Sequence, residues 1–119
     1  DDAPTWIINS TRDDEEGHLK YIALDFSGNM LQQLLTRLYE ANILSLIVEG
    51  GAELLTSFIS KGLWDEARIF ETENVLQEGV PAPLLSAATK AFSTPIASDM
   101  LHVYVHADSP YQYAKEMEL

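Results

Sequence analysis

The stretch ILSLIVEGGAELLTSFISKGLWDEARIF, residues 43–70, decides the fold class. Its first six residues, 43–48, are almost continuously apolar and β-branched at three positions, which predicts a strand covered on both faces. A glycine pair ends that strand, and apolar residues then recur at helical spacing over 52–61. Gly62 stands where a C′ glycine would end the helix, and a further strand follows over 63–70. This order of strand, helix and strand indicates an α/β fold.

Two strands and a helix are expected on the amino-terminal side of this stretch. Residues 5–9 and 19–24 are short β-rich apolar runs and are predicted as strands. Apolar residues recur every three or four positions over 29–41, which predicts an amphipathic helix with Ser27 or Asn29 as its N-cap.

The carboxyl-terminal side adds a loop and a hairpin. Glycine and prolines within 78–83 exclude regular structure there. Residues 91–97 and 101–107 are predicted as strands joined by a hairpin around 98–99, and 109–119 as a short helix. The sum is one α/β domain with a mixed, mostly parallel sheet flanked by helices.

The composition excludes several classes of function. With 19 acidic and 7 basic residues among 119, the net charge is −12, which disfavours partners such as nucleic acid and anionic membranes. No apolar run approaches the roughly 18 residues that span a membrane. The sequence contains no cysteine, which excludes disulfides, thiolate zinc sites and a cysteine nucleophile, and fits a cytoplasmic protein.

The junction Glu49-Gly50-Gly51 is the strongest candidate for chemistry. Two glycines let the backbone turn sharply and let a ligand approach closely. The helix that follows offers free N–H groups and the positive end of its dipole, which suit a phosphate or pyrophosphate. Glu49 is expected on the crevice side of the sheet edge. Because the spacing matches neither a Rossmann fingerprint nor a Walker loop, an ordinary turn stays open as the alternative.

Three motifs in order extend this signal. They are VEGGAEL at 48–54, GL-x-DE at 62–66, and a loop with glycine followed by Ala-Pro. Together they resemble the carboxyl-terminal half of the reductase domain of bacterial bifunctional riboflavin biosynthesis proteins, the deaminase/reductase enzymes. The resemblance covers roughly residues 40–85 and implies a dihydrofolate-reductase-like fold. Residues 1–119 would then be the carboxyl-terminal portion of a single reductase domain.

The resemblance implies an NADPH-dependent reductase of riboflavin biosynthesis. Its substrate would be a phosphorylated aminopyrimidine, 5-amino-6-(5-phosphoribosylamino)uracil, whose ribosyl group is reduced to the ribityl chain. The glutamate before the glycine pair contacts substrate in that family, which falls on Glu49. The family's contacts to the cofactor fall on Gly50, Gly51, Ala52, Glu53, Leu54, Leu55, Thr56 and Ser57. The charge of Glu53 would repel pyrophosphate, so a main-chain contact is expected there. The catalytic residues stay unassigned.

Two departures from the family indicate a fragment with part of the site. The family's opening strands have no counterpart before Ala3, and no Arg or Lys cluster is present to bind the 2′-phosphate of NADPH. The isolated fragment is therefore expected to be inactive. The resemblance also implies a homodimer and, in the full-length protein, an upstream deaminase domain. A zinc deaminase motif needs cysteines, so that domain is not within this chain.

The remaining polar candidates are interpreted without a metal site. The acidic run 12–18, with His18, is expected to be a solvated loop because adjacent carboxylates rarely converge on one ion. His102 and His106 are separated by about 13 Å of strand, too far for one ion, and are expected to face solvent or an interface on an outer strand. Trp64 is interpreted as a core or interface aromatic.

A second function class remains open beside the reductase. Thr56 and Ser57 have no nearby histidine, which argues against a nucleophilic serine. If the glycine pair is an ordinary turn, the chain would be a non-catalytic α/β module for dimerisation or binding. Response to NADPH separates the two classes.

Overall fold

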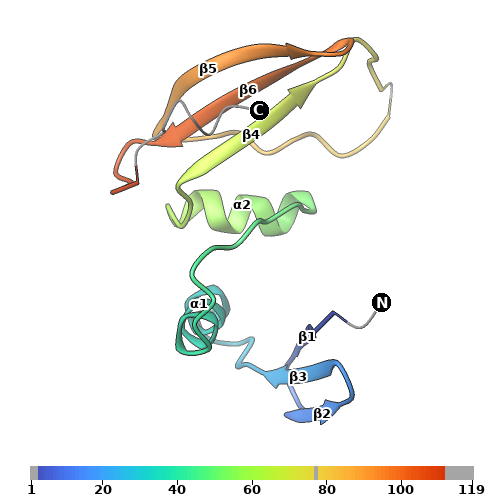
Figure 1. The fold of residues 1–119 in the computed structure, drawn as a ribbon, viewed down its shortest axis with the longest axis vertical. Helices are drawn as coiled ribbons and strands as arrows, with labels where there is room; N and C mark the ends of the chain where they lie inside the picture. Colours follow the sequence, from blue (N-terminus) through green and yellow to red (C-terminus); the bar gives the residue numbers. More distant parts are fainter. Residues whose placement is uncertain (1–2, 77, 112–119) are drawn as a thin grey trace. The chain divides into compact units, whose positions relative to one another are not determined.

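The computed structural model describes residues 3–76 and 78–111, which form two compact units. Unit 1 is Asp1–Ile47 and unit 2 is Val48–Leu119. Among the described residues, each unit holds one three-stranded sheet and one helix (Figure 1). The units are described separately.

Unit 1 consists of a small mixed sheet and the helix that follows it. Its strands are β1 (Thr5–Asn9), β2 (Asp14–Glu16) and β3 (Leu19–Ala23), and its helix is α1 (Met30–Glu40). The order in the sheet is β1-β3-β2, with β1 parallel to β3 and β2 antiparallel to β3. The buried core of unit 1 comprises Ile22, Leu24 and Leu31.

Unit 2 consists of an antiparallel sheet and one helix. The helix is α2 (Ala52–Ser60), and the strands are β4 (Glu66–Glu71), β5 (Ala88–Ile96) and β6 (Asp99–His106). The order is β4-β6-β5, so β6 is central, and Figure 1 shows α2 alongside this sheet. The buried core of unit 2 comprises Phe58, Leu101 and Val103.

Local sequence explains how both helices end. Asn42 after α1 and Gly62 after α2 adopt left-handed φ values of 64° and 66°. In each case the next residue donates its N–H back into the helix, Ile43 to the Leu38 carbonyl and Leu63 to the Phe58 carbonyl, both at 2.9 Å. This is the Schellman arrangement, which satisfies carbonyls at the helix end. The predicted C′ role of Gly62 is confirmed.

Caps and turns at other element ends also follow from residue type. Asn29 is the N-cap of α1, and its side chain accepts from the Gln32 N–H at 3.4 Å. The β5–β6 hairpin turns through Ala97 and Ser98, with φ 53° at Ala97. Pro95 is tolerated because β5 is an edge strand, where a missing N–H breaks no ladder.

The largest difference from the sequence-based prediction is at residues 43–48, which form no strand. Side chains that were expected to be buried are exposed, with Leu44 79% and Ile47 86% accessible. A strand needs hydrogen bonds to a neighbouring strand, and no described segment supplies them here.

The expected mostly parallel sheet is also wrong, while the α/β class is supported. Among the described strands only β1 and β3 pair in parallel, and every other pairing is antiparallel. The predicted loop over 12–18 contains strand β2, which forms a hairpin with β3. The strand expected from residue 63 begins at Glu66, and most of the expected helix over 109–119 lies outside the described residues.

Candidate functional site

The glycine turn before α2 has the backbone form that the sequence predicted. Gly50 has φ +142°, a region that residues with a Cβ rarely adopt, while Gly51 has an ordinary φ of −81° and is the N-cap of α2. The peptide between them is cis. An ideal Cβ built on either glycine would meet no atom within 4 Å, so the turn is open to a ligand.

The amino terminus of α2 presents backbone donors without partners. Gly51 makes no side-chain cap, and the first backbone hydrogen bond into the helix is from the Leu55 N–H to the Gly51 carbonyl at 3.0 Å. Among the described residues, the N–H groups of Ala52, Glu53 and Leu54 therefore have no acceptor. Three free donors at the positive end of a helix can bind an anionic oxygen.

The side chains of this segment divide into exposed and partly buried groups. Glu49, Glu53 and Thr56 are exposed, whereas Leu54 and Leu55 are half-buried. The Ser57 hydroxyl donates to the Glu53 carbonyl at 3.0 Å and is thus used within the helix. The prediction that Glu49 lies at a sheet edge is wrong for this structure, because the preceding residues form no strand.

The groups that segment 49–57 offers to an anion are backbone N–H groups alone. It contains two glutamates and neither lysine nor arginine, so no side chain in it offers a positive charge. Two surface hollows of about 390 and 570 Å³ lie in unit 1, and neither is lined by this segment. The residues that the sequence assigned to the cofactor are adjacent along the chain, and no lysine or arginine among the described residues forms an ion pair with them.

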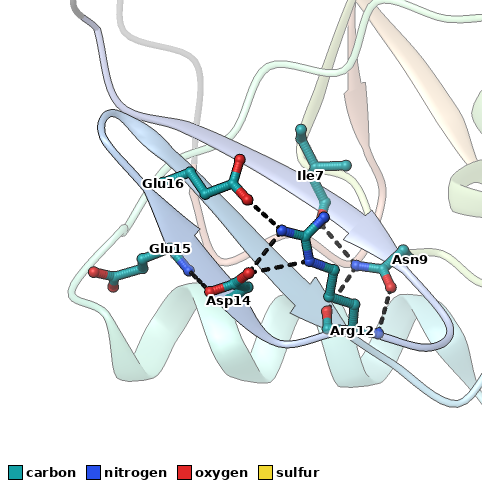
Figure 2. Close-up of polar contacts among 6 residues, drawn as sticks. All are labelled: Ile7, Asn9, Arg12, Asp14, Glu15 and Glu16. Atoms are coloured by element: carbon teal, nitrogen blue, oxygen red, sulfur yellow. Dashed lines mark hydrogen bonds and ion pairs between the residues drawn. The ribbon is translucent and has the colours of Figure 1, made fainter.

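A polar cluster that the sequence did not predict lies in the β2 hairpin (Figure 2). The Arg12 guanidinium donates to the Asp14 carboxylate at 2.6 Å and to Glu16 at 2.5 Å. Its carbon also lies 3.9 Å from the centroid of the Tyr21 ring. One cation thereby offsets the repulsion of neighbouring carboxylates and allows them to occupy one strand.

Asn9 organises the loop that presents Arg12. Its side-chain oxygen accepts from the Thr11 N–H at 2.9 Å and the Arg12 N–H at 2.7 Å. Its amide nitrogen donates to the Arg12 carbonyl at 2.9 Å and to the Ile22 carbonyl at 3.3 Å. Part of this network is drawn in Figure 2. An asparagine at a strand end is the available sequence signal for such a turn.

The cluster predicts a carboxylate titration that depends on Arg12. Hydrogen bonds from Arg12, then from the Glu15 N–H, lower the pKa of Asp14 below its ordinary value. We expect Arg12→Gln to raise the pKa of Asp14 in an NMR titration of the carboxyl carbons. Since the folded-state pKa is depressed, the stabilisation is present above the unfolded pKa and is lost as pH falls through the folded pKa.

Asp25 is the internal control for this titration. Hydrogen bonds from the Ser27 hydroxyl and N–H lower its pKa, and Arg12 takes no part. Arg12→Gln should leave the pKa of Asp25 unchanged. If the pKa of Asp14 stays unchanged, or if the pKa values of Asp14 and Asp25 change equally, Arg12 is not the cause of the lowered pKa of Asp14.

The two histidines of strand β6, His102 and His106, make separate contacts. His102 Nδ1 lies 2.6 Å from the Ser93 hydroxyl, and its Nε2 lies 3.8 Å from a Glu71 carboxylate oxygen. His106 packs edge-on against Trp64, with ring centroids 4.9 Å apart. Both histidines are on the central strand β6 and are partly buried, so their expected place on an outer strand is wrong. Among the residues described, no group of three His, Asp or Glu side chains is arranged to hold a metal ion.

Comparison with known proteins defines the class of this chain. The family model described as the RibD C-terminal domain matches residues 1–72. The chain belongs to the RibD C-terminal domain family, which confirms the resemblance found in the glycine-turn motifs. The riboflavin biosynthesis protein RibD of Aquifex aeolicus (strain VF5) is 32% identical over 83 residues. That match covers 67% of this chain and 23% of the relative. In the described part of the chain, neither helix is long and apolar enough to cross a membrane.

Proposed function

We propose that this chain is the carboxyl-terminal portion of a reductase domain that acts in riboflavin biosynthesis. The proposed reaction is reduction of 5-amino-6-(5-phosphoribosylamino)uracil to its ribityl form with NADPH. The observation that supports it most directly is the open glycine turn, with φ +142° at Gly50 and free N–H groups on α2, at the family's motif. NADPH, when bound, supplies the hydride.

Each part of segment 49–57 has a proposed role. Gly50 and Gly51 let the diphosphate approach the backbone, and the N–H groups of residues 52–54 donate to its oxygens. The exposed Glu53 carboxylate is directed away from the phosphates and stabilises α2 by interacting with the positive end of the helix dipole. The proposed cofactor-contacting residues continue along α2 through Leu55, Thr56 and Ser57. Glu49, exposed beside the turn, accepts a hydrogen bond from the aminopyrimidine substrate.

The remainder of the site is proposed to lie outside this chain. The chain spans less than a quarter of the length of its matched relative, and segment 49–57 carries no positive side chain. The cations that bind the 2′-phosphate of NADPH would then come from another part of the reductase domain. On this proposal the isolated chain is inactive. The full-length protein also carries an upstream deaminase domain, acts in the cytoplasm and forms a homodimer.

The test is steady-state kinetics on the longer protein that contains this chain, with NADPH and the aminopyrimidine as substrates. Glu49→Gln should lower kcat/KM for the aminopyrimidine by roughly 10- to 100-fold, because a hydrogen bond to a charged group contributes about 1.5–3 kcal/mol. The Kd of NADPH should not change. If the variant has a normal kcat/KM, Glu49 does not contact the substrate.

Glu53→Gln is the matched control, since it removes the same charge from the first turn of α2. It should leave kcat/KM for the aminopyrimidine unchanged and should not raise the Kd of NADPH. If the longer protein binds neither NADPH nor the aminopyrimidine, the reductase proposal fails and the non-catalytic binding module becomes the better description.

A further inference from the structure

Three polar side chains from the three strands of unit 2 lie on one face of its sheet. Ser93 on β5 is directly opposite His102 on β6, and Glu71 on β4 is opposite Met100, two residues before His102. Side chains alternate between the two faces along a strand, so residues 100 and 102 and their cross-strand partners share a face. All three side chains belong to unit 2, and their contacts therefore do not depend on where unit 1 lies.

His102 uses both of its ring nitrogens to connect the other two side chains. Its Nδ1 lies 2.6 Å from the Ser93 hydroxyl oxygen, and its Nε2 lies 3.8 Å from a Glu71 carboxylate oxygen. The negative carboxylate favours the tautomer that carries the ring proton on Nε2, which leaves Nδ1 as the acceptor for the hydroxyl proton of Ser93. A hydroxyl, a nitrogen base and a carboxylate in this order activate a nucleophile, here with the two ring nitrogens exchanged relative to the serine hydrolase triad.

The exposure of these side chains leaves the hydroxyl accessible and the base shielded. Ser93 is exposed on β5, which is an edge strand. The His102 side chain is 17% exposed, which limits competition by water for Nδ1, whereas the Glu71 side chain is 73% exposed. Among the described serines, Ser93 is the one that forms a hydrogen bond with a histidine. The Ser57 hydroxyl, by contrast, donates to a backbone carbonyl, which is too weak a base to activate it.

We propose that Ser93 is a nucleophile that accepts an acyl group from an activated ester or thioester, with His102 as its base and Glu71 as a positioning residue. The Ser93 Oγ forms a bond to the carbonyl carbon while its proton moves to His102 Nδ1. The bond from that carbon to the leaving oxygen or sulfur then breaks, and the leaving group takes the proton from Nδ1. The products are acyl-Ser93 and a free alcohol or thiol. The proposal does not depend on the reductase assignment.

The probe is p-nitrophenyl acetate, added to the full chain, with acetylated peptides followed over time by mass spectrometry. We expect Ser93 to be acetylated roughly 100-fold or more faster than Ser98, because a positioned general base contributes about 10²–10⁴ in rate. Ser98 is the matched control, since it is exposed in the turn after β5 and forms no hydrogen bond with a histidine in the described structure. Equal rates at the two serines would overturn the proposal.

His102→Gln tests the base. It should lower the acetylation rate of Ser93 to that of Ser98, because glutamine keeps a polar side chain on the strand but cannot take the proton. Methyl signals of Leu101 and Val103, which are buried on the opposite face of β6, report whether the core persists in the variant. Rapid acetylation of Ser93 in a folded His102→Gln variant excludes His102 as the base.

Glu71→Gln tests the positioning role of the carboxylate. It should lower the acetylation rate of Ser93 by roughly two- to fivefold, the range expected for an exposed ion pair. The difference from the unmodified protein should shrink in about 1 M salt, which screens a charge effect but not a change of packing. Glu73→Gln is the matched control, because Glu73 is exposed and forms no ion pair among the residues described, and it should leave the rate unchanged. Equal effects of the two variants would remove Glu71 from the site.

Discussion

Replacing Leu101 with alanine is expected to lower the free energy of unfolding by about 2–5 kcal/mol, the usual cost of removing a fully buried leucine side chain. Leu101 is 0% exposed on the central strand β6 and is one of three buried apolar residues in the described part of unit 2. A core of this size has few neighbouring side chains that can move to fill the resulting cavity. Urea denaturation followed by far-ultraviolet circular dichroism measures the loss.

Leu84→Ala is the matched control, because it makes the same chemical change at a side chain that is 89% exposed. Its effect should lie within about 0.5 kcal/mol of zero. Similar losses in the two variants would show that Leu101 does not contribute to a buried core. A loss of stability only in Leu101→Ala would support the described sheet order, in which β6 is flanked by a strand on each side.

Replacing Gly50 with alanine is expected to damage the proposed cofactor site most strongly. A residue with a Cβ at φ +142° is strained by roughly 1–3 kcal/mol, and the turn would relax to remove that strain. Relaxation would move the N–H groups of residues 52–54 away from the diphosphate. In the longer protein that contains this chain, we expect the Kd of NADPH to rise at least about tenfold, which corresponds to 1.4 kcal/mol. Isothermal calorimetry with NADPH measures this change.

Gly51→Ala distinguishes backbone strain in the turn from steric obstruction of NADPH by a new methyl group. Gly51 has φ −81°, and a Cβ there meets no atom within 4 Å, so the free energy of unfolding should change by less than about 0.5 kcal/mol. The new methyl group would still lie at the N-cap, beside the free N–H donors, and should weaken the binding of NADPH. If Gly50→Ala binds NADPH as tightly as the unmodified protein does, the glycine turn is not part of the cofactor site.

Features that depend on neighbours in sequence were predicted well. The two helices were expected within one or two residues of their observed bounds, with Asn29 among the two candidate N-caps and Gly62 as the C′ residue. Helix hydrogen bonds join residues four apart, and caps use residues next to the helix, so a short window of sequence contains the interacting groups. The glycine turn was predicted for the same reason.

Features that depend on distant partners were predicted less well. The order β4-β6-β5 places β6 in the centre, although its alternating pattern suits an outer strand equally. The pairing of Arg12 with Asp14 and Glu16 requires the hairpin that brings them together. The contact between Ser93 and His102 similarly depends on the register between β5 and β6.

Residues 43–48 show the difference most clearly. Their composition indicates a buried strand, and the motif that follows them places the chain in the RibD C-terminal domain family. Composition specifies only that the run favours extended, buried backbone; burial itself requires another strand at the right position. From sequence, the helices, their caps, the glycine turn and the family could be established, because their determinants lie close together along the chain. Tertiary structure decided strand order, strand direction and the exposure of this run, because strand hydrogen bonds join residues far apart in sequence.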